Sequence, residues 1–128
     1  MKFKSIHHVA IICSDYERSK RFYSELLGFE IVSEIHRKER QSWKCDLKID
    51  DRSQIELFSF PNPPKRLSYP EACGLRHLAF AVDDVTQARE ALQGKGMEVQ
   101  EIRFDDSTSK RFFFFNDPDG LPIEIYQI

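Results

Sequence analysis

Two short segments of the chain each place a glutamate between apolar residues. They are Ile55-Glu56-Leu57-Phe58 and Ile123-Glu124-Ile125-Tyr126, which lie 68 positions apart. Because side chains alternate across a β-strand, the aliphatic residues of each segment share one face and the glutamate lies on the other. A carboxylate in such a strand is costly unless something pairs with it. The pattern therefore predicts two equivalent strands and a partner for each carboxylate.

The start of each half repeats in the same way. His8-Val9-Ala10-Ile11 matches His77-Leu78-Ala79-Phe80 at a lag of 69, and an aspartate, Asp15 or Asp84, follows each histidine by seven positions. Aspartate at such a position caps a helix by accepting hydrogen bonds from its first N–H groups. We therefore expect a helix after each aspartate. Helical apolar spacing supports both helices, at Phe22, Tyr23, Leu26 and Leu27 and at Val85, Ala88 and Leu92.

Glycines mark the ends of both expected helices. The first is expected to end at Gly28 and the second within Gly94-Lys95-Gly96, because glycine is favoured just past a helix. A strand is expected after each end, beginning at Phe29-Glu30-Ile31 and at Met97-Glu98-Val99. Each half then has the order strand–helix–strand–strand–strand, which predicts an α+β fold of two βαβββ repeats.

The repeats divide the chain at a proline-rich connector. We expect one domain over residues 1–128, with repeat one at about 5–60, the connector at about 61–73 and repeat two at about 74–128. Four of the six prolines fall between Pro61 and Pro70, which predicts a stiff, extended segment. Asp117-Pro118-Asp119-Gly120 is typical of a type I turn joining the last two strands.

Composition narrows the possible partners. The 128 residues are 41% hydrophobic and 31% charged with a net charge of −2, so nucleic acid and anionic membranes are not expected partners. No apolar run approaches the roughly 18–20 residues of a membrane span, and the N-terminus lacks the features of a signal peptide. Cys13, Cys45 and Cys73 form no CxxC pair. They are expected to be small core residues in a reducing cytoplasm.

Alternation along the strands places four polar side chains on the sheet face that lies opposite the bulky apolar residues. If the bulky apolar faces of the sheet all pack against helices, His8, Glu56, His77 and Glu124 share the opposite, concave face. Imidazole and carboxylate together are a typical ligand set for a divalent ion such as Zn²⁺. A bound cation would also offset the cost of placing two glutamates in apolar strands.

Simpler explanations exist for each residue alone. A single strand histidine is more often a hydrogen-bonded structural residue, and a single glutamate usually marks an edge or surface position. Agreement of all four at repeat-equivalent positions favours metal binding. His7 and His36 have no repeat partner, and we expect them to be structural or exposed.

The pattern resembles the vicinal oxygen chelate superfamily and, within it, the glyoxalase I-like proteins. The matching residues span the chain: His8 with Asp15, Ile55-Glu56-Leu57, the segment from Arg76 to Asp83, and the segment from Phe115 to Gly120 followed by Glu124. The resemblance implies a cup-shaped half-barrel and a homodimer. It also implies one octahedral divalent ion (Zn, Ni, Co or Mn) held by His8, Glu56, His77 and Glu124.

The resemblance also implies a reaction. A glyoxalase I-like lyase isomerises the hemithioacetal of a 2-oxoaldehyde to a 2-hydroxyacyl thioester through a metal-chelated enediolate. Glu124 is the first candidate for the base that moves the proton, with Glu56 as its partner. The alternatives are epimerisation, thiol transfer, or a non-catalytic module that binds a small molecule and confers resistance.

Residues expected to hold the thiol depart from this family. Bacterial glyoxalase I commonly has arginine four residues after the first ligand histidine and asparagine four after the first ligand glutamate, where this chain has Ile12 and Phe60. The loss of a charge-assisted contact worth roughly 1.5–3 kcal/mol argues against glutathione as the natural thiol. The weaker candidates for substrate contacts are Arg37, Arg40, Trp43, Lys110 and Arg111. Phe58, Phe60 and half of the run Phe112–Phe115 could line the site.

Overall fold

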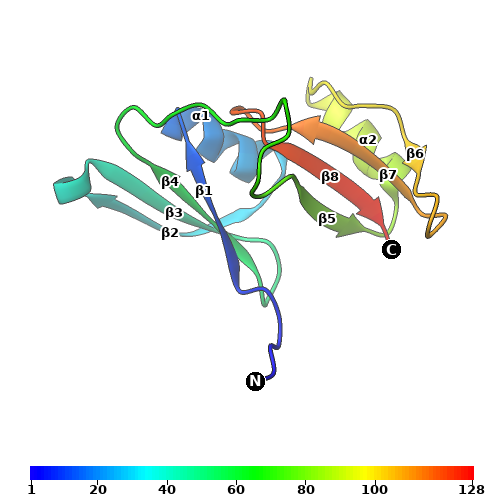
Figure 1. Ribbon diagram of the computed structural model, residues 1–128, viewed down its shortest axis with the longest axis horizontal. Coiled ribbons are helices and arrows are strands. Elements are labelled where there is room, and N and C mark those ends of the chain that lie inside the picture. The colour runs from blue at the N-terminus through cyan, green and yellow to red at the C-terminus, as the bar shows by residue number, and fades with distance from the viewer. The chain divides into compact units, whose positions relative to one another are not determined.

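The computed structural model describes residues 1–128 and divides them into two compact units, Met1–Lys65 and Arg66–Ile128 (Figure 1). The division falls inside the proline-rich connector. Each unit has strands, one helical segment and further strands, which confirms the α+β class and the two βαβββ repeats. No helix is both long and apolar enough to cross a membrane.

The first unit is a four-stranded sheet with a helical segment against one face (Figure 1). Its strands lie in the order β1-β4-β3-β2, with β1 and β4 parallel and the other neighbours antiparallel. The elements are β1 (His8–Cys13), α1 (Tyr16–Arg21), η1 (Phe22–Leu26), β2 (Glu30–Arg37), η2 (Lys38–Arg40), β3 (Ser42–Lys48) and β4 (Gln54–Ser59).

The second unit repeats this topology. Its order is β5-β8-β7-β6, with β5 and β8 parallel, so the first and last strands of each unit are neighbours. The elements are β5 (Leu78–Val82), α2 (Val85–Gly94), β6 (Arg103–Phe104), β7 (Arg111–Asn116) and β8 (Pro122–Gln127). The shared strand order is the structural counterpart of the repeat in the sequence.

The two faces of each sheet are buried unequally, as parity predicts. In the first unit Ile55 and Leu57 are fully buried on the helix side, and in the second Ile123 is fully buried in the same way. Burying each such side chain contributes roughly 1.5–3 kcal/mol. Glu56 and Glu124 retain 15% and 13% side-chain exposure on the other face. Each glutamate therefore lies at the edge of the apolar core and not inside it.

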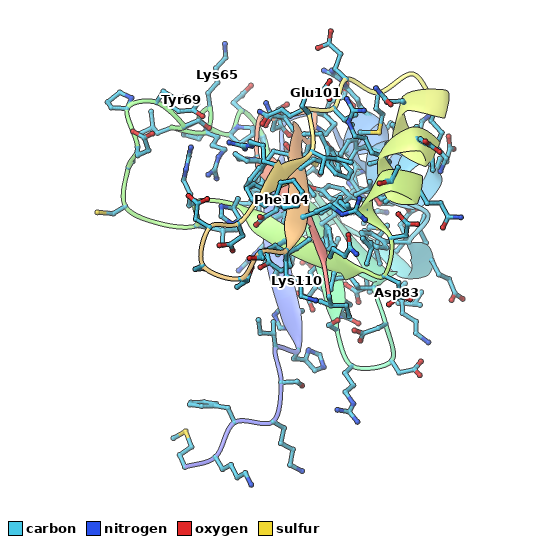
Figure 2. The ribbon with its side chains drawn as sticks, turned by 90° about the vertical axis from the view of Figure 1, so that its right-hand side faces the viewer. Lys65, Tyr69, Asp83, Glu101, Phe104 and Lys110 are labelled. Carbon is cyan, nitrogen blue, oxygen red and sulfur yellow. The ribbon has the colours of Figure 1, made fainter.

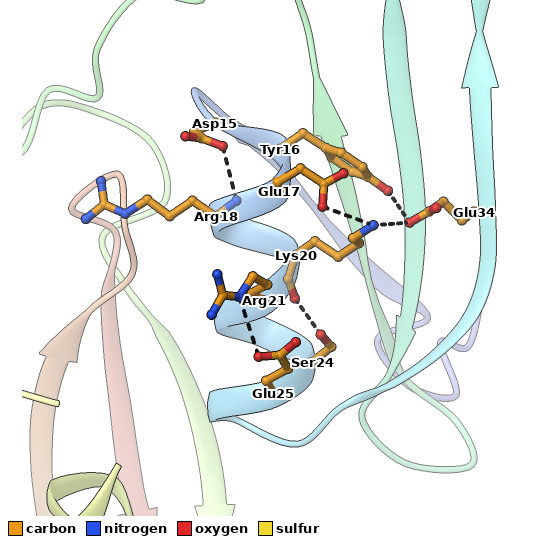
Figure 3. Close-up of polar contacts among 9 residues, drawn as sticks. All are labelled: Asp15, Tyr16, Glu17, Arg18, Lys20, Arg21, Ser24, Glu25 and Glu34. Carbon is orange, nitrogen blue, oxygen red and sulfur yellow. Dashed lines mark hydrogen bonds and ion pairs between the residues drawn. The ribbon is translucent and has the colours of Figure 1, made fainter. Parts of the chain in front are cut away.

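Both helix caps are formed as expected. The Asp15 carboxylate accepts a hydrogen bond from the Arg18 N–H at 3.1 Å (Figure 3), and the Asp84 carboxylate accepts from two N–H groups at the start of α2. The first helical segment ends in a π-helical turn before Gly28, whose φ of +81° suits glycine because a Cβ disfavours this region.

Two expectations about individual segments are wrong. No strand begins at Met97, and β6 consists only of Arg103–Phe104. The backbone near Gln100 makes one cross-strand hydrogen bond, from its N–H to Phe114, while its carbonyl accepts from the Arg89 side chain of α2. The carbonyl that a strand ladder would use is therefore occupied by the helix.

The second wrong expectation is that Cys73 is a core residue. It is exposed in the connector, whereas Cys13 and Cys45 are buried in the core of the first unit. Burial raises the pKa of the Cys45 thiol, as expected for a small core residue in apolar surroundings. All three cysteines are free thiols. Composition could not separate the three positions, because a thiol is compatible with either environment.

Candidate metal centre

The first unit brings His8 and Glu56 together from two parallel neighbouring strands. Glu56 is in register with Ala10, so His8 lies two positions before its partner on the same face of β1. His8 Nε2 lies 3.7 Å from Glu56 Oε2, and the two side chains are 43% and 15% exposed. The parity argument correctly placed this pair on the face opposite the helix.

The second unit forms the equivalent pair at the same register. Glu124 is in register with Ala79, two positions after His77, and His77 Nε2 lies 3.1 Å from Glu124 Oε2. The exposed fractions, 37% and 13%, are close to those of the first pair. One strand geometry has therefore produced the same imidazole–carboxylate pair in both units.

The spacing of each pair fits a shared cation. Protein ligands lie about 2.0–2.2 Å from a zinc-like ion, which puts neighbouring donors in an octahedron about 3 Å apart. The observed 3.1 and 3.7 Å therefore suit two cis ligands, each offering one nitrogen and one oxygen. Neither unit assembles three or more His, Cys, Asp or Glu side chains that could hold an ion.

Glu56 has charged neighbours that the sequence analysis missed. Lys44 Nζ lies 3.4 Å from Glu56 Oε1 and 2.8 Å from Asp46 Oδ1, and Asp46 is directly opposite Glu56 across β3 and β4. The hydrogen bond to Asp46, and then the charges of Asp46 and Glu56, raise the pKa of Lys44. Lys44 thus holds one oxygen of Glu56 while the other faces His8.

Glu124 has aromatic neighbours where Glu56 has charged ones. Phe114 is directly opposite Glu124 across β7 and β8, and its ring lies edge-on to His77 with the centroids 5.1 Å apart. Glu124 forms no hydrogen bond or ion pair except with His77, so its Oε1 is unengaged. The two carboxylates therefore occupy equivalent positions but different environments.

His7 lies beside His8, although it has no counterpart in the second repeat. The two Nδ1 atoms are 2.9 Å apart, so one of these nitrogens donates a hydrogen bond to the other. A histidine that ligates through Nε2 usually donates its Nδ1 proton to a neighbour, which fixes its tautomer. His7 is exposed, as expected, but it can orient the His8 ring.

The remaining sequence candidates occupy different surfaces. Trp43 lies on the helix side of the first sheet, stacked on Tyr16 with the centroids 5.2 Å apart. Arg111 lies on the helix side of the second sheet, where its guanidinium donates to Gln127 and to Thr86 of α2. Arg40 and Lys110 are exposed, the latter in the loop between β6 and β7 (Figure 2).

Arg37 is the candidate that lies on the same face as Glu56. Its guanidinium carbon lies 4.9 Å from the centroid of the Phe58 ring and 5.8 Å from that of Phe60, and its Nη2 donates to Ser42 at 2.9 Å. Phe58 and Phe60 stack on each other with their centroids 6.1 Å apart. Ile12, on the His8 face of β1, is 56% exposed.

Comparison with known proteins identifies the family. Residues 5–125 match the model of the Glyoxalase/Bleomycin resistance protein/Dioxygenase superfamily. The chain belongs to this superfamily, which confirms the resemblance drawn from the repeated motifs.

Several relatives are similar over nearly the whole chain. YaeR of Escherichia coli (strain K12) is 56% identical over 97% of this chain and 96% of its own length, and is named an uncharacterized protein. YwkD of Bacillus subtilis (strain 168), also named uncharacterized, is 56% identical over 99% of both chains. A solved glyoxalase family protein from Enterococcus faecalis is 48% identical over 99% of this chain and 100% of its own, with a TM-score of 0.92.

Relatives named for an activity are more distant. A probable lactoylglutathione lyase of Vibrio parahaemolyticus is 25% identical over 95% of this chain and 89% of its own length. A 2-epi-5-epi-valiolone epimerase of Actinomyces sp is 26% identical over 97% of this chain and 79% of its own length. The comparisons therefore define the superfamily, within which lyases and epimerases both occur.

Proposed function

We propose that this protein is a metal-dependent, glyoxalase I-like lyase. It isomerises the hemithioacetal of a 2-oxoaldehyde to a 2-hydroxyacyl thioester. The observation that carries the proposal is the repeated His–Glu pair, which occurs at the same register in both units of a member of this superfamily. Glutamate at both carboxylate positions is the feature that most resembles glyoxalase I.

The proposed metal site uses the His–Glu pair of each unit. His8 and Glu56 of one unit and His77 and Glu124 of the other supply two imidazole nitrogens and two carboxylate oxygens to one Zn, Ni, Co or Mn ion. When bound, such an ion supplies Lewis-acid stabilisation of the negative charge that develops on two adjacent substrate oxygens. The histidines serve as ligands only.

Glu124 is the proposed base because one of its oxygens is free to accept a proton. Lys44 engages Glu56 Oε1, whereas Glu124 Oε1 has no partner. Glu124 can therefore remove the proton from the carbon beside the substrate carbonyl and return it to the neighbouring carbon. Glu56 stays in place as the second carboxylate, oriented by Lys44.

Epimerisation is the second candidate function. It is favoured by the similarity to an epimerase and by the absence of the two expected thiol contacts, at Ile12 and Phe60. An epimerase needs the same proton removal beside a carbonyl, but a proton is then delivered to the opposite face of the same carbon. The two candidates therefore share the metal and the base that removes the proton, and they differ in the substrate and in the carbon face that is protonated.

The test is an assay of the metal-loaded protein with hemithioacetals of methylglyoxal made from several thiols, glutathione included. The lyase proposal predicts thioester formation with at least one of them, detected by its ultraviolet absorbance. Absence of turnover with all of them, in protein that holds its ion, would overturn the lyase proposal and favour epimerisation.

The Glu124→Gln variant tests the base. Removal of the carboxylate that accepts the proton should lower kcat by at least about 100-fold, since general base catalysis typically contributes 10²–10⁴-fold. The amide oxygen can still face the ion, so most of the metal should remain, as measured by mass spectrometry of the purified variant. Full activity in this variant would remove Glu124 from the base role.

The assembly and location of the protein stay predictions. We expect a homodimer that binds a small molecule, such as a thiol adduct, in the cytoplasm. Light scattering during size-exclusion chromatography measures the first of these directly.

A further inference from the structure

Arg37 is an arginine without an acidic partner on the face that carries Glu56. It ends β2, where it is in register with Ser42 of β3, and the only hydrogen bond of its side chain runs from Nη2 to the Ser42 hydroxyl. It forms none of the ion pairs in the chain, although the equally charged Arg89 pairs with Glu101 at 2.8 Å. Its positive charge is therefore not balanced by any side chain.

The Arg37 guanidinium is nevertheless held in place. It lies over the rings of Phe58 and Phe60, where cation–π attraction and the Ser42 hydroxyl restrict its orientation. Its Nε is buried and has no acceptor. A buried donor without a partner is destabilising, so this position of the guanidinium is not explained by its own hydrogen bonds. Because this Nε is buried, the ends available to a ligand are Nη1, which has no acceptor, and Nη2, which also donates to Ser42. An oriented guanidinium can bind a planar anion through two parallel hydrogen bonds from these two groups.

The position of Arg37 sets its distance from the candidate metal centre. Phe58 lies two residues after Glu56 on the same face of β4, about 7 Å along the strand. Two cations lie near the Phe58 ring, with the Arg37 guanidinium 4.9 Å and the Lys44 ammonium 6.0 Å from its centroid. An anion on Arg37 is therefore roughly 10 Å from the carboxylate of Glu56.

We propose that Arg37 binds a carboxylate at the end of the substrate remote from the metal, and so selects acidic substrates. This inference rests on the proposed function for the reacting end of the substrate. The connecting part of the substrate lies over the Phe58 ring, which favours an apolar chain of about six methylene groups or its equivalent in length. Arg37 thereby supplies a carboxylate contact that Ile12 cannot make.

The test uses two ligands that differ only at the remote end. Suberic acid monohydroxamate offers two adjacent oxygens to a metal at one end and a carboxylate at the other, and its methyl ester replaces that carboxylate with a neutral group. Their dissociation constants are measured by calorimetry on zinc-loaded wild-type protein and on Arg37→Met, Arg37→Lys and Arg40→Met. Methionine keeps the aliphatic packing of Arg37, and Arg40 is an exposed arginine three positions away whose removal changes net charge equally.

The expected result is a preference of the wild type for the acid over the ester of about 10- to 100-fold, the range for a charge-assisted contact. Arg37→Met should lose this preference while binding the ester within about twofold of the wild type. Arg37→Lys should retain part of it, because lysine keeps the charge but not the fork. Arg40→Met should retain all of it.

The inference is overturned if the wild type does not distinguish the two ligands, or if Arg37→Met and Arg40→Met lose the preference equally. Turnover of hemithioacetals without any acid preference would overturn this inference and leave the proposed lyase intact. Acid-selective binding that depends on Arg37, without turnover, would support this inference and count against the lyase. Thermal melting of each variant separates a loss of binding from a loss of fold.

Discussion

The two glutamates show how equivalent residues acquire different properties from their cross-strand neighbours. Glu56 faces Asp46, with Lys44 bridging the two carboxylates, whereas Glu124 faces the ring of Phe114. The duplicated pattern placed both glutamates, but the strands beside them, β3 and β7, do not carry the same residues. The difference assigns them different roles in the proposed reaction.

Lys44 should have opposite effects on folding and on metal binding. Lys44→Met leaves Asp46 and Glu56 as neighbouring like charges, and should lower the free energy of unfolding of the metal-free protein by about 1–2 kcal/mol. A divalent ion replaces the missing positive charge and is no longer repelled by the ammonium. Metal should therefore bind the variant more tightly and restore much of the lost stability. Urea denaturation with and without zinc measures both effects.

The matched control for this prediction is Lys48→Met. Lys48 lies on the same strand and pairs with Asp51 at 2.8 Å, but Asp51 is 93% exposed. A surface pair of this kind contributes little to stability, and its loss should not change metal binding. Equal behaviour of the two variants would show that Lys44 acts only through net charge.

At the scale of elements, a polar cluster joins α1 to β2. Glu34 Oε2 accepts hydrogen bonds from the Tyr16 hydroxyl at 2.7 Å and from Lys20 Nζ at 3.0 Å (Figure 3). Burial, and then the bond to Glu34, raises the pKa of Tyr16, while the bonds from Tyr16 and then Lys20 lower the pKa of Glu34. The cluster connects α1 to β2, the outer strand of the sheet, three residues before Arg37.

Glu34 should make the stability of the protein depend on acidity. Because folding lowers the pKa of Glu34 below its ordinary 4.5, its stabilising effect is complete above that pH and is lost as the pH falls through the folded-state value. Glu34→Gln should lower the free energy of unfolding by about 1–2 kcal/mol at pH 7. Variant and wild type should converge once the pH falls below the lowered folded-state pKa of Glu34, because both then carry an uncharged group. Urea denaturation across this pH range tests the prediction.

Glu17→Gln is the comparison for Glu34. Glu17 contacts the same ammonium of Lys20 at 3.4 Å, but its side chain is 71% exposed. We expect this variant to lose less than about 0.5 kcal/mol at any pH, as is usual for an exposed pair. A cost in Glu34→Gln that does not shrink as the pH falls would mean that shape, and not charge, makes the contact.

At the scale of the whole molecule, each unit offers only half of the proposed ligand set. The His8–Glu56 and His77–Glu124 pairs belong to different compact units. If two pairs share one ion, the protein should hold one divalent ion per chain. His8→Ala, His77→Ala and the double variant should all lose nearly all of it on dialysis, because the three ligands left in each single variant, and the two left in the double variant, bind the ion more weakly than four. Metal content after exhaustive dialysis, measured by mass spectrometry, gives the ratio.

Separate sites would produce a different result. If each unit held its own ion, each single variant would keep the ion of the intact unit and only the double variant would be empty. Treatment with a chelator adds a second measurement, since removal of a shared ion should abolish turnover and lower the melting temperature. Re-addition of zinc should restore both.

The sequence by itself determined the duplication, the helix caps and the face on which each glutamate lies. These features are local, because a strand alternates with a period of two and an aspartate caps the helix that directly follows it. The same alternation identified Glu56 and Glu124 as equivalent residues. It failed at the segment after Met97, which does not form a complete strand ladder. This segment has residues typical of a strand, but the Arg89 side chain of α2 donates a hydrogen bond to the Gln100 carbonyl.

Only the tertiary structure decided which residues surround each glutamate. The contacts of Lys44 with Glu56, of Phe114 with His77 and of Arg37 with Phe58 join residues that are far apart in the chain. Such contacts depend on the register between strands, which cannot be obtained from the periodicity of either strand alone. Periodicity therefore locates the candidate ligands, whereas strand register sets their electrostatic environment.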